Sequence, residues 1–155
     1  MPAGPGSEEG DEWAGGVVLG VDVHAACEET LAFVFEAAER RSAPLKVLNG
    51  WEPPPTYGPR PMVLPGGAID GVLAERAGAL AKKVRPWGEK HPGVRVDARA
   101  VLAQPAELLL DASQEAALLV VGRRRRDASL GAHVGPVAHA AMHHAQAPVA
   151  VVPHP

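Results

Sequence analysis

The chain of 155 residues, with a mass of 16.1 kDa, is long enough for one domain with one hydrophobic core. Apolar residues make up 46% of it and aromatic residues only 4%, so we expect a core of valine, leucine and alanine, as in parallel sheets covered by helices. The net charge of −3 includes four acidic residues near the N-terminus, and the nearly neutral remainder excludes wholesale binding to nucleic acid.

The expected compartment is the cytoplasm. No apolar run approaches the roughly 20 residues that cross a bilayer, and the first residues lack the charged and then apolar order of a signal peptide. The single cysteine, Cys27, has no partner for an internal disulfide, which suits a reducing compartment. We therefore expect no membrane partner.

The chain begins irregularly and then alternates between two patterns. Residues 1–15 are rich in glycine, proline and acidic residues, which predicts a disordered acidic tail ahead of a folded domain at 16–155. Within that domain, short apolar runs alternate with segments whose apolar residues recur at helical spacing. In chain order they predict a strand at 16–22, a helix at 27–41, a strand at 45–51, a helix at 68–90, a strand at 94–101, a helix at 105–115, a strand at 116–121, a helix at 136–145 and a strand at 148–153.

Proline and residue alternation refine these elements. Six prolines at 52–66 predict a long irregular loop, and Pro86 predicts an interruption of the second helix. Pro105 suits the first turn of the helix that it opens. Apolar and charged residues alternate at 94–101, which predicts an edge strand with one face in water.

Five strands that alternate with four helices predict an α/β fold, a single-domain Rossmann-like three-layer sandwich with a five-stranded, mainly parallel sheet. Ligands of such sheets bind beyond the carboxyl ends of the strands, where the strand order reverses. Asp22, the proline-rich loop and Gly122 lie at such ends, so we expect them at one rim. The apolar last strand, 148–153, is expected at an edge and predicts a homodimer that forms through it.

The segment after the fourth strand has the pattern of a phosphate-binding loop. An apolar strand leads through Gly122 into the arginines 123–126, and a helix starts near Gly135. Backbone N–H groups at a helix N-terminus favour a bound anion, and glycine permits its close approach. However, Pro136 has no N–H, and Arg125 brings a long side chain into the loop. The segment therefore predicts an anion site whose phosphate end is altered.

Over residues 16–153 the chain resembles the universal stress protein family, through the runs VVLGVD, LKVLNGWEPP, VVGRRRR and GPVAHAAMHHAQAPVAVV. Nucleotide-binding members of that family carry glycine, two residues, glycine, nine residues, glycine, and then serine or threonine. In this chain Gly122 and Gly135 keep their places, Arg125 replaces the middle glycine, and Pro136 replaces the hydroxyl residue.

The resemblance implies a cytoplasmic dimer that acts as a stress-response regulatory module with an adenine-nucleotide site. ATP or another adenine nucleotide would be its ligand, with Mg²⁺ only where ATP is bound, and the altered loop would weaken or abolish ATP binding. The resemblance assigns Asp22 to the ribose or adenine. It assigns Val21 and Gly50 to the adenine wall, and Val121, Gly122 and Val137 to the base and phosphates.

Two other functions remain open from the sequence. One is a slow ATP hydrolase, in which Asp22 holds a divalent ion and the arginines stabilise charge. The other is an interaction protein in which Arg125 and Pro136 close the pocket. The favoured function has no catalytic residue.

Three histidines of the last helix, His139, His143 and His144, invite a metal hypothesis. The spacing lacks the glutamate of an HExxH zinc site, because Ala140 stands there, so we predict histidines on the helix surface and no metal. The arginines at 123–126 have no interleaved aromatic residues, which favours a solvated loop or a small anion over nucleic acid.

Overall fold

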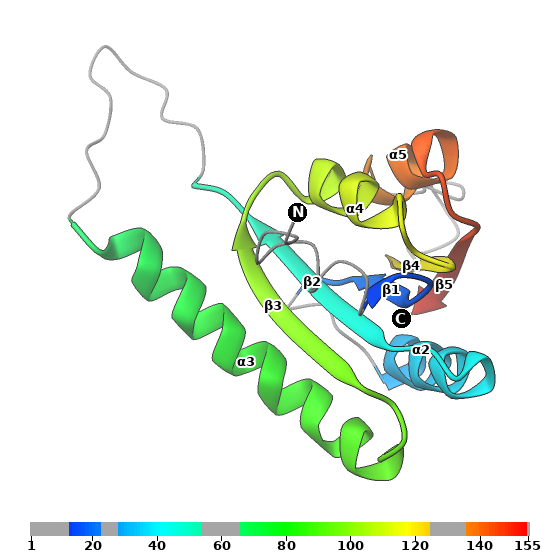
Figure 1. Ribbon diagram of the computed structural model, residues 1–155. Coiled ribbons are helices and arrows are strands. Elements are labelled where there is room, and N and C mark those ends of the chain that lie inside the picture. The colour runs from blue at the N-terminus through cyan, green and yellow to red at the C-terminus, as the bar shows by residue number, and fades with distance from the viewer. Residues whose placement is uncertain (1–12, 23–27, 54–65, 125–135, 155) are drawn as a thin grey trace, which may run out of the picture.

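The computed structural model describes residues 13–22, 28–53, 66–124 and 136–154 (Figure 1). Five strands and four helices alternate along these segments. In chain order they are β1 (Val17–Gly20), α2 (Glu28–Arg41), β2 (Leu45–Trp51), α3 (Ala68–Lys90), β3 (Val96–Leu102), α4 (Pro105–Ser113), β4 (Leu118–Arg124), α5 (Pro136–His144) and β5 (Val149–His154).

The strands form one parallel sheet in the order β3-β2-β1-β4-β5. β1 lies at the centre, with Gly20 opposite Leu48 of β2 and Val121 of β4. The predicted α/β fold is thereby confirmed, and so is the prediction that the third strand lies at an edge. β5 forms the other edge of the sheet.

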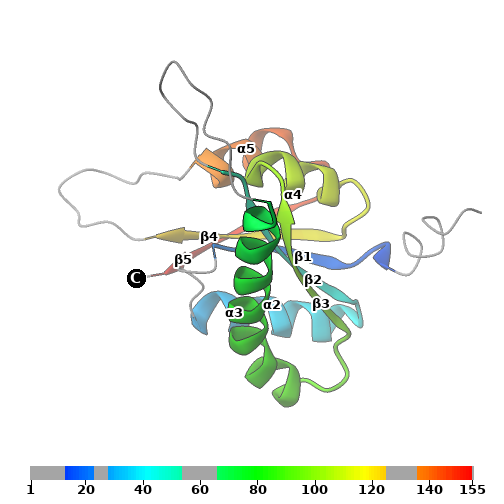
Figure 2. The ribbon, with the colours of Figure 1, turned by 90° about the vertical axis from the view of Figure 1, so that its left-hand side faces the viewer.

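Helices cover both faces of the sheet, and alternate strand residues supply two cores. Figure 2 shows α4 and α5 above the sheet and α2 below it. Val17 and Leu19 of β1 point into the core beneath α2 and α3, whereas Val18 points into the core beneath α4 and α5. The centre of the first core is Phe35 of α2, which is fully buried and stacks on Trp87 of α3 with 6.4 Å between ring centroids. The sheet and its helices thus form three layers.

Most strand and helix ends differ by one or two residues from those predicted, and two differences have a clear physical reason. The prediction of an interruption at Pro86 is wrong, because α3 continues through this residue to Lys90. Proline removes one helical hydrogen bond, but Pro86 is exposed in the last turns, and the next residue, Trp87, packs on Phe35. β4 also continues past the predicted end at 121, because its backbone stays paired with β5 as far as Arg124.

The end of the predicted N-terminal tail contacts the folded domain. The Gly15 N–H donates to the Glu115 carbonyl over 2.7 Å. The Lys46 ammonium and the Arg95 guanidinium lie 5.7 Å and 5.1 Å from the centre of the Trp13 ring. Residues 1–12 lie outside the described residues, so the disordered tail stays a prediction. Among the residues that the structure describes, no helix is both long and apolar enough to pass through a bilayer.

Two phenylalanines of α2 test the position of the core. Phe35 has no exposed surface, whereas Phe33 is 40% exposed. We expect Phe35→Ala to lower the free energy of unfolding by about 3–5 kcal/mol, because it leaves a cavity against Trp87. Phe33→Ala is the matched control and should cost about 1 kcal/mol or less. Urea unfolding measures both, and equal losses would contradict this assignment of the core.

Candidate functional site

The candidate site is the rim at the carboxyl ends of β1, β2 and β4. Gly20 is level with Leu48 and Val121 in the sheet, so the next residues of the three strands, including Val21 and Gly122, emerge side by side. The chain then leaves β1 for α2 on one face and β4 for α5 on the other. Such a point of reversal is where α/β sheets bind ligands.

The structure brings most of the predicted site residues to this rim. Asp22 follows β1 and is exposed, and Val21 donates its N–H to the Leu48 carbonyl over 3.0 Å. Val137 lies in the first turn of α5 and packs on the core beneath that helix. Arg125 and Gly135 fall outside the described residues.

Two of the predicted residues are also held in place by packing. Val121 is 2% exposed, and its side chain packs in the core beneath α4 and α5. A Cβ added to Gly50 would lie 2.9 Å from the Cα of Pro105 and 3.1 Å from the Ala103 carbonyl oxygen. β2 therefore needs glycine at position 50 to approach the start of α4, whether or not a ligand binds there.

The arginine-rich segment begins differently from its prediction. Gly122, Arg123 and Arg124 belong to β4 and pair with Val152, Pro153 and His154 of β5. The predicted strand ends at Val121, where the apolar run ends, and the loop is expected to follow directly. That boundary is wrong, because ladder hydrogen bonds join backbones and do not depend on side-chain charge.

Sequence reasoning missed a polar cluster at the end of β2. The Asn49 side chain is 3% exposed, and its Nδ2 donates to the Val21 carbonyl over 2.8 Å. Arg76 of α3 donates from Nη1 to Asn49 Oδ1 over 3.4 Å. The same guanidinium lies over the Trp51 ring, with Cζ 5.6 Å from its centre. A lone asparagine in an apolar strand was the available signal, because a buried amide requires partners.

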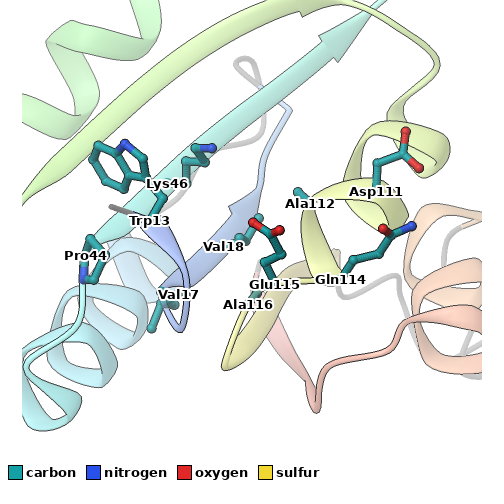
Figure 3. A pocket seen from close by; sticks show the side chains of 11 residues that line it. Trp13, Val17, Val18, Pro44, Lys46, Asp111, Ala112, Gln114, Glu115 and Ala116 are labelled. Atoms are coloured by element: carbon teal, nitrogen blue, oxygen red, sulfur yellow. The ribbon is translucent and has the colours of Figure 1, made fainter. Parts of the chain in front are cut away.

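A separate cavity of about 260 Å³ opens at the opposite end of the strands. Figure 3 shows Trp13 and Lys46 on one side of it, and on the other Asp111 of α4 and Glu115, which follows that helix. Val17 and Lys46 stand at the beginnings of β1 and β2, whereas the rim lies at the strand ends. The mixed charges do not select an anion, so this cavity is not the predicted nucleotide site.

The histidines of α5 lie on its surface. His139, His143 and His144 are exposed, and the rings of His139 and His143 meet with centroids 4.4 Å apart. Over the described segments of the chain, no group of three or more histidine, cysteine, aspartate and glutamate side chains is arranged to hold a metal ion.

The chain belongs to the universal stress protein family, whose model matches residues 16–153. Universal stress proteins of Mycobacterium bovis and Mycobacterium tuberculosis are 32% identical to it over 135 residues, which cover 87% of this chain and 44% of theirs. The chain thus spans less than half the length of these curated relatives.

Solved structures of the same family share the fold. The universal stress protein UspA from Lactobacillus plantarum superimposes with a TM-score of 0.63 at 19% identity, over 90% of this chain and 98% of that one. A universal stress protein in complex with cAMP gives 0.53 at 18% identity, over 90% and 97%. The protein from Archaeoglobus fulgidus in complex with dAMP gives 0.54 at 19% identity, over 88% and 96%.

Gly50 provides a test of how the rim is built. We expect Gly50→Ala to lower the free energy of unfolding by about 1–3 kcal/mol in the absence of nucleotide, because the added methyl group overlaps the backbone of Pro105. Gly78 is the matched control: it is exposed in α3, and an added Cβ would meet nothing within 4 Å. Gly78→Ala should raise stability by about 0.5–1 kcal/mol. Thermal unfolding compares the two, and a neutral Gly50→Ala would contradict the packing role.

Proposed function

We propose that this protein is a stress-response regulatory module that binds an adenine nucleotide at the rim of β1, β2 and β4. The observation that carries the proposal is the reversal of strand order there, which gathers Val21, Asp22, Gly50 and Gly122 beside the start of α5. Family members of the same fold that are described in complex with cAMP and dAMP support the ligand class.

The proposed contacts divide between two halves of the rim. In the base half, Val21 and Gly50 line the adenine, and Asp22 accepts hydrogen bonds from the ribose or the base. In the phosphate half, the backbones of Val121 and Gly122 lead toward Arg125 and Gly135, and Val137 follows in α5. The base half rests on β1 and β2, whereas most of the phosphate half follows β4 in the chain.

The phosphate half is altered in a way that should weaken the hold on a triphosphate. Pro136 is the first residue of α5 and offers neither an N–H nor a hydroxyl group. Each lost charge-assisted hydrogen bond is worth about 1.5–3 kcal/mol, so two losses would weaken ATP by about two decades or more. A nucleoside monophosphate relies less on this end. We therefore propose that the base and ribose supply most of the affinity, with Mg²⁺ present only alongside ATP.

Calorimetry on the full chain tests this proposal. We expect the double variant Arg125→Gly with Pro136→Ser to bind ATP about 100-fold more tightly than the wild type, because it regains two phosphate donors. AMP should bind the two proteins with affinities within about threefold of each other.

The control for loss of a guanidinium is Arg85→Gln, because Arg85 is an exposed residue of α3 that pairs with Glu89. This variant should bind ATP as the wild type does. Equal ATP affinity of the wild type and the double variant would contradict the altered phosphate half. Absence of AMP and ATP binding from both proteins would contradict the nucleotide site itself.

We further propose that two copies associate through β5. This strand forms one edge of the sheet, and Val149 and Val151 belong to one core while Ala150 and Val152 belong to the other. An edge strand presents unpaired backbone groups, and pairing with a second copy would satisfy them.

Light scattering coupled to size-exclusion chromatography tests the dimer. We expect a mass near twice 16.1 kDa at micromolar concentrations. Dilution to the monomer should speed hydrogen exchange at the amides of β5 and leave that of the internal strand β2 unchanged, since β2 is paired on both sides within one chain. A monomeric mass at every concentration would rule out this interface.

A further inference from the structure

We propose that Asn49 and Arg76 form a positioning pair that holds the end of β1 in the geometry required by the nucleotide. This inference rests on the proposed function, because the residues that the pair holds, Val21 and Asp22, belong to the base half of the rim. It adds a contribution from α3, which the predicted site lacks.

Asn49 occupies a place where packing alone would favour an apolar side chain. Leu45 and Val47 of the same strand are fully buried in the core beneath α2 and α3, and Asn49 continues their alternation. A buried amide costs free energy unless its donors and acceptors are satisfied. Its Nδ2 reaches the Val21 carbonyl over 2.8 Å, so the amide is used to bind the backbone of the neighbouring strand.

The bond from Asn49 extends the attachment of β1 beyond its last strand residue, Gly20. The Val21 N–H donates to the Leu48 carbonyl over 3.0 Å, and the Val21 carbonyl accepts from Asn49. Both backbone polar groups of Val21 are therefore held by β2. Because Asp22 is the next residue, the direction in which it leaves the sheet depends on this attachment.

Arg76 determines which way the Asn49 amide points. A guanidinium has only donors, so it can approach the Oδ1 side of the amide and not the Nδ2 side. The Nη1–Oδ1 distance of 3.4 Å places the oxygen toward α3, which leaves Nδ2 directed at Val21. The Trp51 ring lies against the guanidinium, with Cζ 5.6 Å from its centre, and so limits its orientation. A lysine would keep the charge without the planar group.

The first experiment measures AMP binding by calorimetry to the full chain. We expect Arg76→Met and Arg76→Lys each to weaken AMP binding by about tenfold, because the Asn49 amide loses the planar group that orients it. Arg85→Met is the matched control on the same helix. The Arg85 side chain is 82% exposed, and its replacement removes the same charge. It should bind AMP as the wild type does. Wild-type affinity in Arg76→Lys would overturn the pair, because charge alone would then suffice.

The second experiment needs no nucleotide and separates this inference from the proposed function. We expect the side-chain NH₂ protons of Asn49 to exchange slowly in nuclear magnetic resonance spectra of the wild type and at least about tenfold faster in Arg76→Met. Unchanged exchange would overturn the pair even if nucleotide binds. If exchange changes as expected and the wild type binds no nucleotide, the pair stands as a structural device and its role in binding fails with the proposed function. Urea unfolding of each variant verifies that the fold persists.

Discussion

The placement of β1 between β2 and β4 is the constraint on which the rest of the structure depends. Its four residues pair on both sides, and Val17 and Leu19 have no exposed surface. Burial of such side chains contributes about 1.5–3 kcal/mol each, so the central strand is fixed by the core it fills. Gly20 completes this arrangement, because an added Cβ would lie 2.2 Å from Cδ1 of the buried Leu109. The position of β1 therefore sets the geometry of the rim.

The sequence was sufficient for most of the fold, because parallel strands and their helices have strong local patterns. The strand at 45–51 and the helix at 68–90 have the predicted bounds. Prediction failed where a contact with a residue distant in the sequence outweighed a local sequence rule. The proline rule failed at Pro86, where Trp87 stacks on Phe35. The end of the apolar run failed as a marker of the strand end at Val121, where backbone pairing with β5 continues.

The candidate site was predictable to a smaller extent. Strand ends are visible in the sequence, so Asp22, the proline-rich loop and Gly122 could be placed at one rim. Val21, Gly50 and Val121 were named only from the family resemblance. The pair of Asn49 and Arg76 could not, because its members are 27 positions apart and belong to different elements. An arginine in a helix has many uses, and only the fold shows that Arg76 meets the one buried polar position on the inner face of β2 among the described residues.

The two halves of the proposed site differ in how closely ligand binding is tied to folding. In the base half, Val21 is held by two hydrogen bonds and Gly50 leaves no room for a side chain beside Pro105, so a change there also disturbs the packing. In the phosphate half, the residue that best starts the helix differs from the residue that would best bind a phosphate. Proline suits the first position of a helix, since its fixed φ favours the helix and its missing N–H is not needed there, and Pro136 occupies that position in α5. A serine would offer a phosphate two donors but would lose this preference. Pro136 therefore favours formation of the last helix. Under the proposed function it offers less to a phosphate, and recognition would rest on the half of the rim that the core holds in place.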